Sequence, residues 1–131
     1  MKKTILVIED NEQNLYLVTF LLIKAGCEVV AARDGREGIV RAASVMPDLI
    51  LLDIQLPVMS GYEVAAELKR NPALAEIPIV AVTSYAMAGD RERVLSYGCE
   101  GYIEKPIDPD AFVDQIKQHL LDDSQEAGEK S

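Results

Sequence analysis

The chain has 131 residues and a formal net charge of −9, and hydrophobic residues make up 49% of it. This length suits one compact domain with a substantial core. Thirteen Lys and Arg residues against twenty-two Asp and Glu residues argue against binding to duplex nucleic acid or to an anionic membrane surface. Its apolar stretches are too short for a membrane span or a secretion signal, so we expect a cytoplasmic protein.

The two cysteines, Cys27 and Cys99, lie far apart in the sequence. Neither has the closely spaced Cys or His neighbours that a structural zinc site requires. We interpret both as small thiols that are buried or half-buried in the fold. The single histidine, His119, falls in the last helix-like segment, and we interpret it as a surface or flanking residue rather than as a ligand.

Five strand-like segments alternate with five helix-like segments along the chain. The strand-like segments are short and apolar, as in strands buried on both faces, and they are residues 4–8, 27–32, 48–52, 77–82 and 101–104. The helix-like segments are residues 12–25, 35–45, 63–70, 87–97 and 109–121. Ser60, followed by Glu63, predicts the N-cap of the third helix. Residues 122–131 are polar, and we expect a disordered tail after a domain of residues 1–121.

This alternation predicts an α/β fold with a doubly wound, five-stranded parallel sheet flanked by five helices. In open sheets of this type, ligands bind at the carboxyl ends of the strands. Four of the five predicted strands end in charged or hydroxyl residues, namely Glu9-Asp10, Asp53, Thr83-Ser84 and Lys105-Pro106.

These strand ends together suit phosphoryl chemistry. Carboxylates held close together repel one another unless a cation lies between them, and Mg²⁺ prefers such oxygen ligands. An ionised Asp beside Mg²⁺ can attack phosphorus and form an acyl phosphate. Lys105 and the Thr83 hydroxyl, with a backbone N–H group, would then balance the charge of the transferred group. Taken singly, each residue also has an ordinary structural role, such as helix capping for an Asp or a turn for Thr83.

The order of an acidic pair, Asp, Thr and Lys-Pro resembles the receiver domain of two-component response regulators, a CheY-like superfamily. The resemblance extends from Lys3 to Leu121 and implies a flavodoxin-like sheet with strand order 2-1-3-4-5. Among subfamilies, the chain is most similar to single-domain, DivK-like regulators and to the receiver domains of hybrid kinases. Four segments carry the resemblance: residues 7–11 (VIEDN), 53–61 (DIQLPVMSG), 81–84 (AVTS) and 101–106 (GYIEKP).

The resemblance implies that Asp53 is the phosphoacceptor for a histidine kinase or a histidine phosphotransfer protein. It also implies a Mg²⁺ site formed by Asp53, Asp10, Glu9 through water, and the backbone carbonyl of Gln55. The Gln55 and Tyr85 side chains would flank the phosphoryl group and control the access of water.

The resemblance further implies that Thr83 and Tyr102 form a switch and that Lys105 pairs with the phosphorylated site. The face formed by residues 87–97, 101–104 and 109–121 would then bind a downstream effector protein or a second copy of the chain. Such a protein catalyses its own phosphorylation and dephosphorylation without turning over a small-molecule substrate. The implied structural residues are Pro57, Gly61 and Pro106, the last in a cis peptide bond with Lys105.

Three alternatives stay open at this point. A Mg²⁺-dependent phosphohydrolase with an Asp nucleophile would carry a DxD pair, including that nucleophile, at the end of the first strand. In this chain the first strand ends in Glu9-Asp10-Asn11, and the lone Asp53 follows the third strand. A flavodoxin-like cofactor carrier would need a phosphate-binding loop there, and Glu9-Asp10 would repel phosphate. A degenerate receiver that acts only as a scaffold is disfavoured because all the reactive positions are filled.

Overall fold

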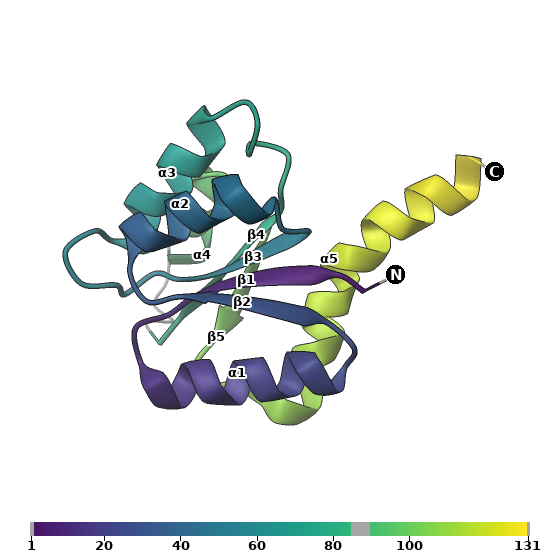
Figure 1. Ribbon diagram of the computed structural model, residues 1–131, viewed down its shortest axis with the longest axis horizontal. Coiled ribbons are helices and arrows are strands. Elements are labelled where there is room, and N and C mark those ends of the chain that lie inside the picture. The colour runs from purple at the N-terminus through teal and green to yellow at the C-terminus, as the bar shows by residue number, and fades with distance from the viewer. Residues whose placement is uncertain (1, 85–89, 131) are drawn as a thin grey trace.

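The computed structural model describes residues 2–84 and 90–130, and its centre is a parallel sheet with helices on both faces (Figure 1). The strands lie in the order β2-β1-β3-β4-β5. This confirms the predicted doubly wound α/β fold and its strand order. The strands are β1 (Thr4–Ile8), β2 (Glu28–Ala32), β3 (Leu49–Asp53), β4 (Ile79–Thr83) and β5 (Gly101–Glu104).

Side chains that alternate along each strand build two separate cores. In β1, Ile5 and Val7 face one side of the sheet, whereas Leu6 and Ile8 face the other. The first side is covered by α1 (Glu12–Lys24) and α5 (Pro109–Lys130). The second side is covered by α2 (Gly35–Val45), α3 (Gly61–Arg70) and α4 (Asp90–Ser96). Because both faces of the sheet are buried, the strands read as continuous apolar runs in the sequence.

Several element boundaries differ from those predicted. β4 begins at Ile79 rather than Ile77, because Pro78 has no N–H group to donate to the ladder. α3 begins at Gly61, directly after the Ser60 N-cap. The Ser60 hydroxyl accepts a hydrogen bond from Glu63 N at 3.3 Å, and the Glu63 carboxylate accepts one from Ser60 N at 3.1 Å. For α4, the predicted start at Met87 lies outside the described residues.

α5 continues to Lys130, past the end that the sequence predicted at Leu121. Its last turns project away from the sheet, towards the C-terminus (Figure 1). A helix can continue beyond its packed part because each turn bonds to the preceding turn of the same segment. The division into a domain of residues 1–121 and a tail stays a prediction. Within the described residues, no helix has both the length and the apolar character needed to cross a bilayer.

The strand register aligns the carboxyl ends of four strands at one edge of the sheet. Ile8 in β1 pairs with Leu52, and Asp53 pairs with Val82 in β4. Thr83 pairs with Glu104 in β5, and its carbonyl accepts a hydrogen bond from Lys105 N at 2.8 Å. The residues that end or follow these strands therefore converge, although they are far apart in the sequence.

Candidate functional site

Three carboxylates meet at this edge of the sheet. Carboxylate oxygens of Glu9, Asp10 and Asp53 all lie within 4.8 Å of one another. Glu9 and Asp53 are buried, with 4% and 3% of their surface exposed, whereas Asp10 is exposed. Such a set of oxygen donors, open to solvent on one side, suits a hard divalent cation.

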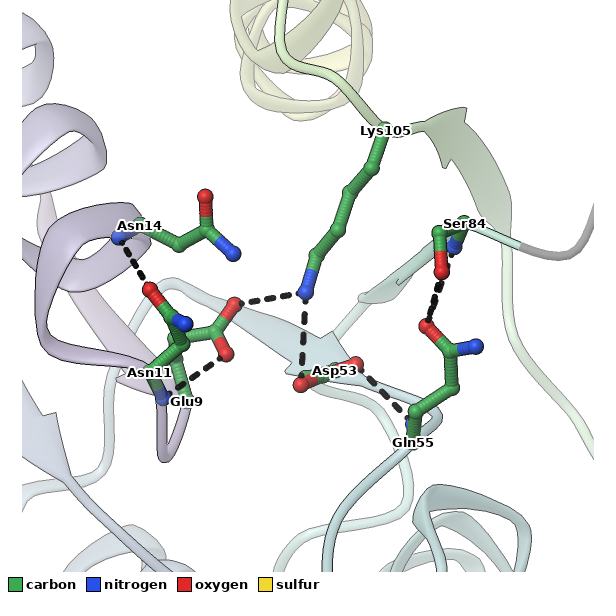
Figure 2. A network of polar contacts seen from close by, with 7 residues as sticks. All are labelled: Glu9, Asn11, Asn14, Asp53, Gln55, Ser84 and Lys105. Atoms are coloured by element: carbon green, nitrogen blue, oxygen red, sulfur yellow. Dashed lines mark hydrogen bonds and ion pairs between the residues drawn. The ribbon is translucent and has the colours of Figure 1, made fainter.

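Lys105 reaches into this acidic pocket from the end of β5. Its Nζ atom lies 3.1 Å from Glu9 Oε1 and 3.4 Å from Asp53 Oδ2, as Figure 2 shows. The lysine side chain is only 13% exposed, so water screens these two ion pairs weakly. Its peptide bond to Pro106 is cis. One lysine charge offsets the three carboxylates only in part.

The pKa of Glu9 is raised to about 7, mainly by burial and then by the hydrogen bond to Asp53 and the charge of Asp53. Lys105 and the Asn11 N–H group, which donates to Glu9 Oε2 at 3.2 Å, act in the opposite direction. The pocket therefore favours additional positive charge, either as a proton on Glu9 or as a cation.

Asp53 is held by its own loop. Its Oδ1 atom accepts a hydrogen bond from Gln55 N at 2.9 Å, which leaves Oδ2 beside Lys105. Gly61 lies directly behind this loop. A Cβ atom at Gly61 would lie 2.5 Å from Ile54 Cα and 2.6 Å from the Asp53 carbonyl oxygen. Only glycine lets α3 begin this close to the Asp53 main chain.

The capping of α1 does not use the acidic pair. The N-cap is Asn11, whose Oδ1 atom accepts a hydrogen bond from Asn14 N at 2.9 Å. Asn11 therefore caps the N-terminus of α1, and neither Glu9 nor Asp10 is needed for this purpose. The Asp10 carboxylate is left exposed beside the pocket.

Thr83 and Tyr102 occupy neighbouring strands near the pocket. Thr83 is the last residue of β4 and is buried. Tyr102 in β5 is half-buried and packs against the core on the side of α2, α3 and α4. Thr83 also lines a cleft of about 380 Å³ together with Tyr62 from α3 and Arg93 from α4. Tyr85 lies outside the described residues.

The other residues predicted from the sequence lie at the edges of the site or away from it. Pro57 is exposed in the loop after β3, next to Val58, which has a positive φ of 67°. His119 in α5 is half-buried against Gly101, the first residue of β5, at the opposite end of that strand from Lys105. Cys99 is buried and Cys27 is half-buried, and both are free, as expected.

The sequence did not reveal one contact beside the pocket. The Gln55 side-chain oxygen accepts hydrogen bonds from Ser84 N at 3.0 Å and from Ser84 Oγ at 2.8 Å. From the resemblance, the backbone carbonyl of Gln55 was expected to bind Mg²⁺, and its side chain was expected to flank the phosphoryl group. The available signal was that Gln55 and Ser84 follow the ends of adjacent strands, β3 and β4.

Comparison with known proteins identifies the family. Residues 5–117 match the family model of the response regulator receiver domain. The chain belongs to this family, and so to two-component signalling. Two relatives, each named polar-differentiation response regulator DivK, come from Brucella anthropi and Brucella ovis. Each is 46% identical to this chain, over 93% of this chain and 99% of the relative. The resemblance inferred from the four motifs is confirmed.

Solved structures agree with this assignment. The receiver domain of sensor histidine kinase PA1611 from Pseudomonas aeruginosa has 33% sequence identity and a TM-score of 0.81, over 90% of this chain and 96% of that one. It was solved with a magnesium ion coordinated in its active site cleft. A CheY-like receiver domain protein from Methanospirillum hungatei has 28% identity and a TM-score of 0.88, over 96% of this chain and 99% of that one.

Proposed function

We propose that this receiver accepts a phosphoryl group on Asp53 from a histidine kinase or a histidine phosphotransfer protein, and that this event switches a protein-binding surface. The observation that carries the proposal is the pocket itself. A buried Asp53 carboxylate lies within 4.8 Å of the Glu9 and Asp10 oxygens and 3.4 Å from the Lys105 ammonium. The family membership and the DivK relatives support the same conclusion.

The pocket fits Mg²⁺. Glu9, Asp10, Asp53 and the backbone carbonyl of Gln55 would hold the ion, since carboxylate and carbonyl oxygens are the donors that this metal prefers. The raised pKa of Glu9 supports this fit, because burial and the neighbouring Asp53 both disfavour its charged form and a bound cation would offset that cost. Bound there, Mg²⁺ would neutralise part of the charge on the carboxylates and on the phosphoryl oxygens. The magnesium in the Pseudomonas receiver supports this assignment.

In the transfer step, a carboxylate oxygen of Asp53 attacks phosphorus. The new O–P bond forms as the N–P bond of the donor's phosphohistidine breaks, and the electron pair returns to the imidazole nitrogen. The Gln55 N–H group fixes the orientation of the attacking carboxylate. Lys105 and the Thr83 hydroxyl supply positive charge and a donor for the phosphoryl oxygens.

The switch follows from the added charge. Phosphorylation adds a charge of roughly −1.5 to −2, which draws Lys105 and Thr83 towards Asp53. Lys105 is bonded through its main chain to the Thr83 carbonyl, so β4 and β5 respond together. Tyr102, also in β5, then repacks, and the face of α4, β5 and α5 changes between two states. This face would bind an effector protein or a second phosphorylated copy of the chain, in the cytoplasm.

Phosphorylation by acetyl phosphate with Mg²⁺, followed by intact-mass spectrometry, tests the proposal. The wild-type chain should gain one phosphoryl group, and Asp53→Asn should gain none. Asp114→Asn, an exposed aspartate on α5, is the matched control and should be phosphorylated like the wild type. Chelation of Mg²⁺ should stop the reaction. Undiminished phosphorylation of Asp53→Asn would refute the assignment of the acceptor.

A further inference from the structure

Gln55 connects the acceptor to the end of β4 through two different groups. Its main-chain N–H donates to Asp53 Oδ1 at 2.9 Å, while its side-chain oxygen accepts from Ser84 N at 3.0 Å and from Ser84 Oγ at 2.8 Å (Figure 2). Because an amide N–H can only donate, the group that faces Ser84 N must be the side-chain oxygen and not the NH₂ group. The orientation of the Gln55 carboxamide is thereby fixed.

Gln55 engages two donors of the kind that a phosphoryl group on Asp53 would need. A transferred phosphoryl group carries charge on its equatorial oxygens, and these oxygens need hydrogen-bond donors. Asp53 pairs with Val82 across β3 and β4, so the end of β4 lies beside the acceptor. Ser84 is the first residue after β4, and both its amide and its hydroxyl are bonded to Gln55.

We propose that the Gln55 side chain is an autoinhibitory latch, which occupies Ser84 N–H and so competes with the phosphoryl group for this donor. Gln55 acts through Ser84 and is therefore a positioning residue. Loading of Asp53 then requires that the bond from Ser84 N–H to Gln55 break. The inference rests on the proposed function and adds to it a contact that holds the unphosphorylated state.

The structure offers a place for the released side chain. Gln55 is half-buried and lines the cleft of about 380 Å³ with Ile54, Leu56, Ser60, Tyr62, Thr83 and Arg93. A rotation of the carboxamide into this cleft would leave the Gln55 main chain, and so its bond to Asp53, in place. The latch can therefore open without any change in how the acceptor is oriented.

Gln55→Met tests the latch because methionine has a similar length but only a weak acceptor in its thioether. Gln118→Met, an exposed glutamine on α5, is the matched control. Gln55→Glu keeps an acceptor oxygen and should preserve the bond to Ser84 N. Ser84→Ala removes only the hydroxyl bond and leaves the main chain of Gln55 untouched.

The first measurement is amide hydrogen exchange at Ser84 by NMR, in unphosphorylated protein without metal. Exchange should become about fivefold faster in Gln55→Met, the factor that one net hydrogen bond of about 1 kcal/mol gives. It should rise less in Ser84→Ala, and it should stay at the wild-type rate in Gln55→Glu and Gln118→Met. Unchanged exchange in Gln55→Met would overturn the latch.

The second measurement is the affinity for beryllofluoride with Mg²⁺, as a mimic of the bound phosphoryl group. Gln55→Met should bind it about fivefold more tightly than the wild type, because the hydrogen bond from Ser84 N–H does not have to be broken first. Equal or weaker binding by this variant, while the wild type binds, overturns the latch and leaves the proposed function intact. If the wild type itself binds no beryllofluoride, the proposed function fails and the latch fails with it.

Discussion

Asp10 differs from its two partners in the acidic pocket because it is exposed. Without a cation, three carboxylates within 4.8 Å repel one another, and removing the exposed one relieves repulsion without leaving a cavity. We therefore expect Asp10→Asn to stabilise the metal-free protein by about 0.5–2 kcal/mol. Mg²⁺ should raise the Tm of the wild type but not that of the variant, since ligand binding stabilises only the protein that binds it.

Thermal unfolding with and without Mg²⁺ measures both effects, and Asp114→Asn serves as the control for the loss of one exposed charge. A less stable Asp10→Asn in the metal-free state would contradict the view that the pocket is strained by its own charges. An equal rise of Tm with Mg²⁺ in both proteins would show that Asp10 is not a ligand.

The two thiols differ in burial and should differ in reactivity. Burial raises the pKa of the Cys99 thiol to about 12. Burial also raises the pKa of the half-buried Cys27 thiol, but the positive charge of Lys117 offsets part of that rise. Because the thiolate is the reactive form, we expect an aromatic disulfide reagent at pH 8 to label Cys27 first in the native protein. Cys27→Ser should remove the fast phase of labelling, and Cys99→Ser should leave it. A fast phase that persists in Cys27→Ser would contradict the assigned burial.

The burial of Cys99 also has a consequence for stability against pH. The folded-state pKa lies above the unfolded value of 9.0, so the folded protein holds its proton at a pH where the unfolded chain loses it. This contribution is fully present below pH 9 and is lost as the pH rises towards 12. Chemical denaturation should therefore show that Cys99→Ala loses less stability than the wild type does between pH 9 and pH 10.5.

Among the elements, the start of α3 is tied to the end of β3 through Gly61. Gly61→Ala would push a methyl group against two main-chain atoms of Asp53 and Ile54, which cannot move independently of the pocket. We expect a loss of about 1–3 kcal/mol and slower phosphorylation by acetyl phosphate. Gly26→Ala is the control, because Gly26 has a φ of +92° but open space around it. It should cost stability through backbone strain and leave phosphorylation unchanged. Equal phosphorylation rates in the two variants would contradict this role of Gly61.

Lys69 joins three separate segments on the opposite edge of the sheet. Its ammonium donates to the carbonyls of Ala75 and Ile77 at 2.9 and 3.1 Å and pairs with Glu100 at 3.1 Å. Glu100 in turn accepts from Ile79 N at 2.8 Å, at the start of β4. Lys69→Met leaves these acceptors without their partner and should cost about 1–3 kcal/mol in urea denaturation.

The matched control for Lys69 is Arg36→Met. Arg36 lies 3.8 Å from Glu67 and its side chain is 71% exposed, so its loss should cost less than about 0.5 kcal/mol. If both substitutions cost the same, the Lys69 contacts contribute no more than an exposed ion pair.

Features that depend on residues close together in the sequence were predicted well. Contacts between segments that are far apart in the sequence were not. The capping box at Ser60 and Glu63 is local, and it was found. The contact between Gln55 and Ser84 was missed because it depends on how two loops approach each other, which strand periodicity does not encode. The contacts of Lys69 were missed for the same reason, since Lys69 and Glu100 are brought together only by the packed fold. The predicted end of α5 at Leu121 was too early, because the polar residues that follow were expected to form a tail, although polar residues can also extend a helix.

At the scale of the whole molecule, the parallel sheet accounts for the site. Glu9, Asp53, Thr83 and Lys105 each end or follow a strand, and parallel strands bring their carboxyl ends to one edge. The position of the acidic pocket could therefore be predicted from the order of elements alone. The distances within it could not, because burial and the side-chain geometry of Lys105 set them.

We expect Asp53 to carry the phosphoryl group. Its most direct test is to phosphorylate the protein with acetyl phosphate and Mg²⁺, to reduce the acyl phosphate with borohydride, and to map the modified residue by peptide mass spectrometry. We expect one modified position, residue 53, and none when Mg²⁺ is chelated. Modification at another carboxylate, or none at all in the presence of Mg²⁺, would contradict the assignment of Asp53 as the acceptor.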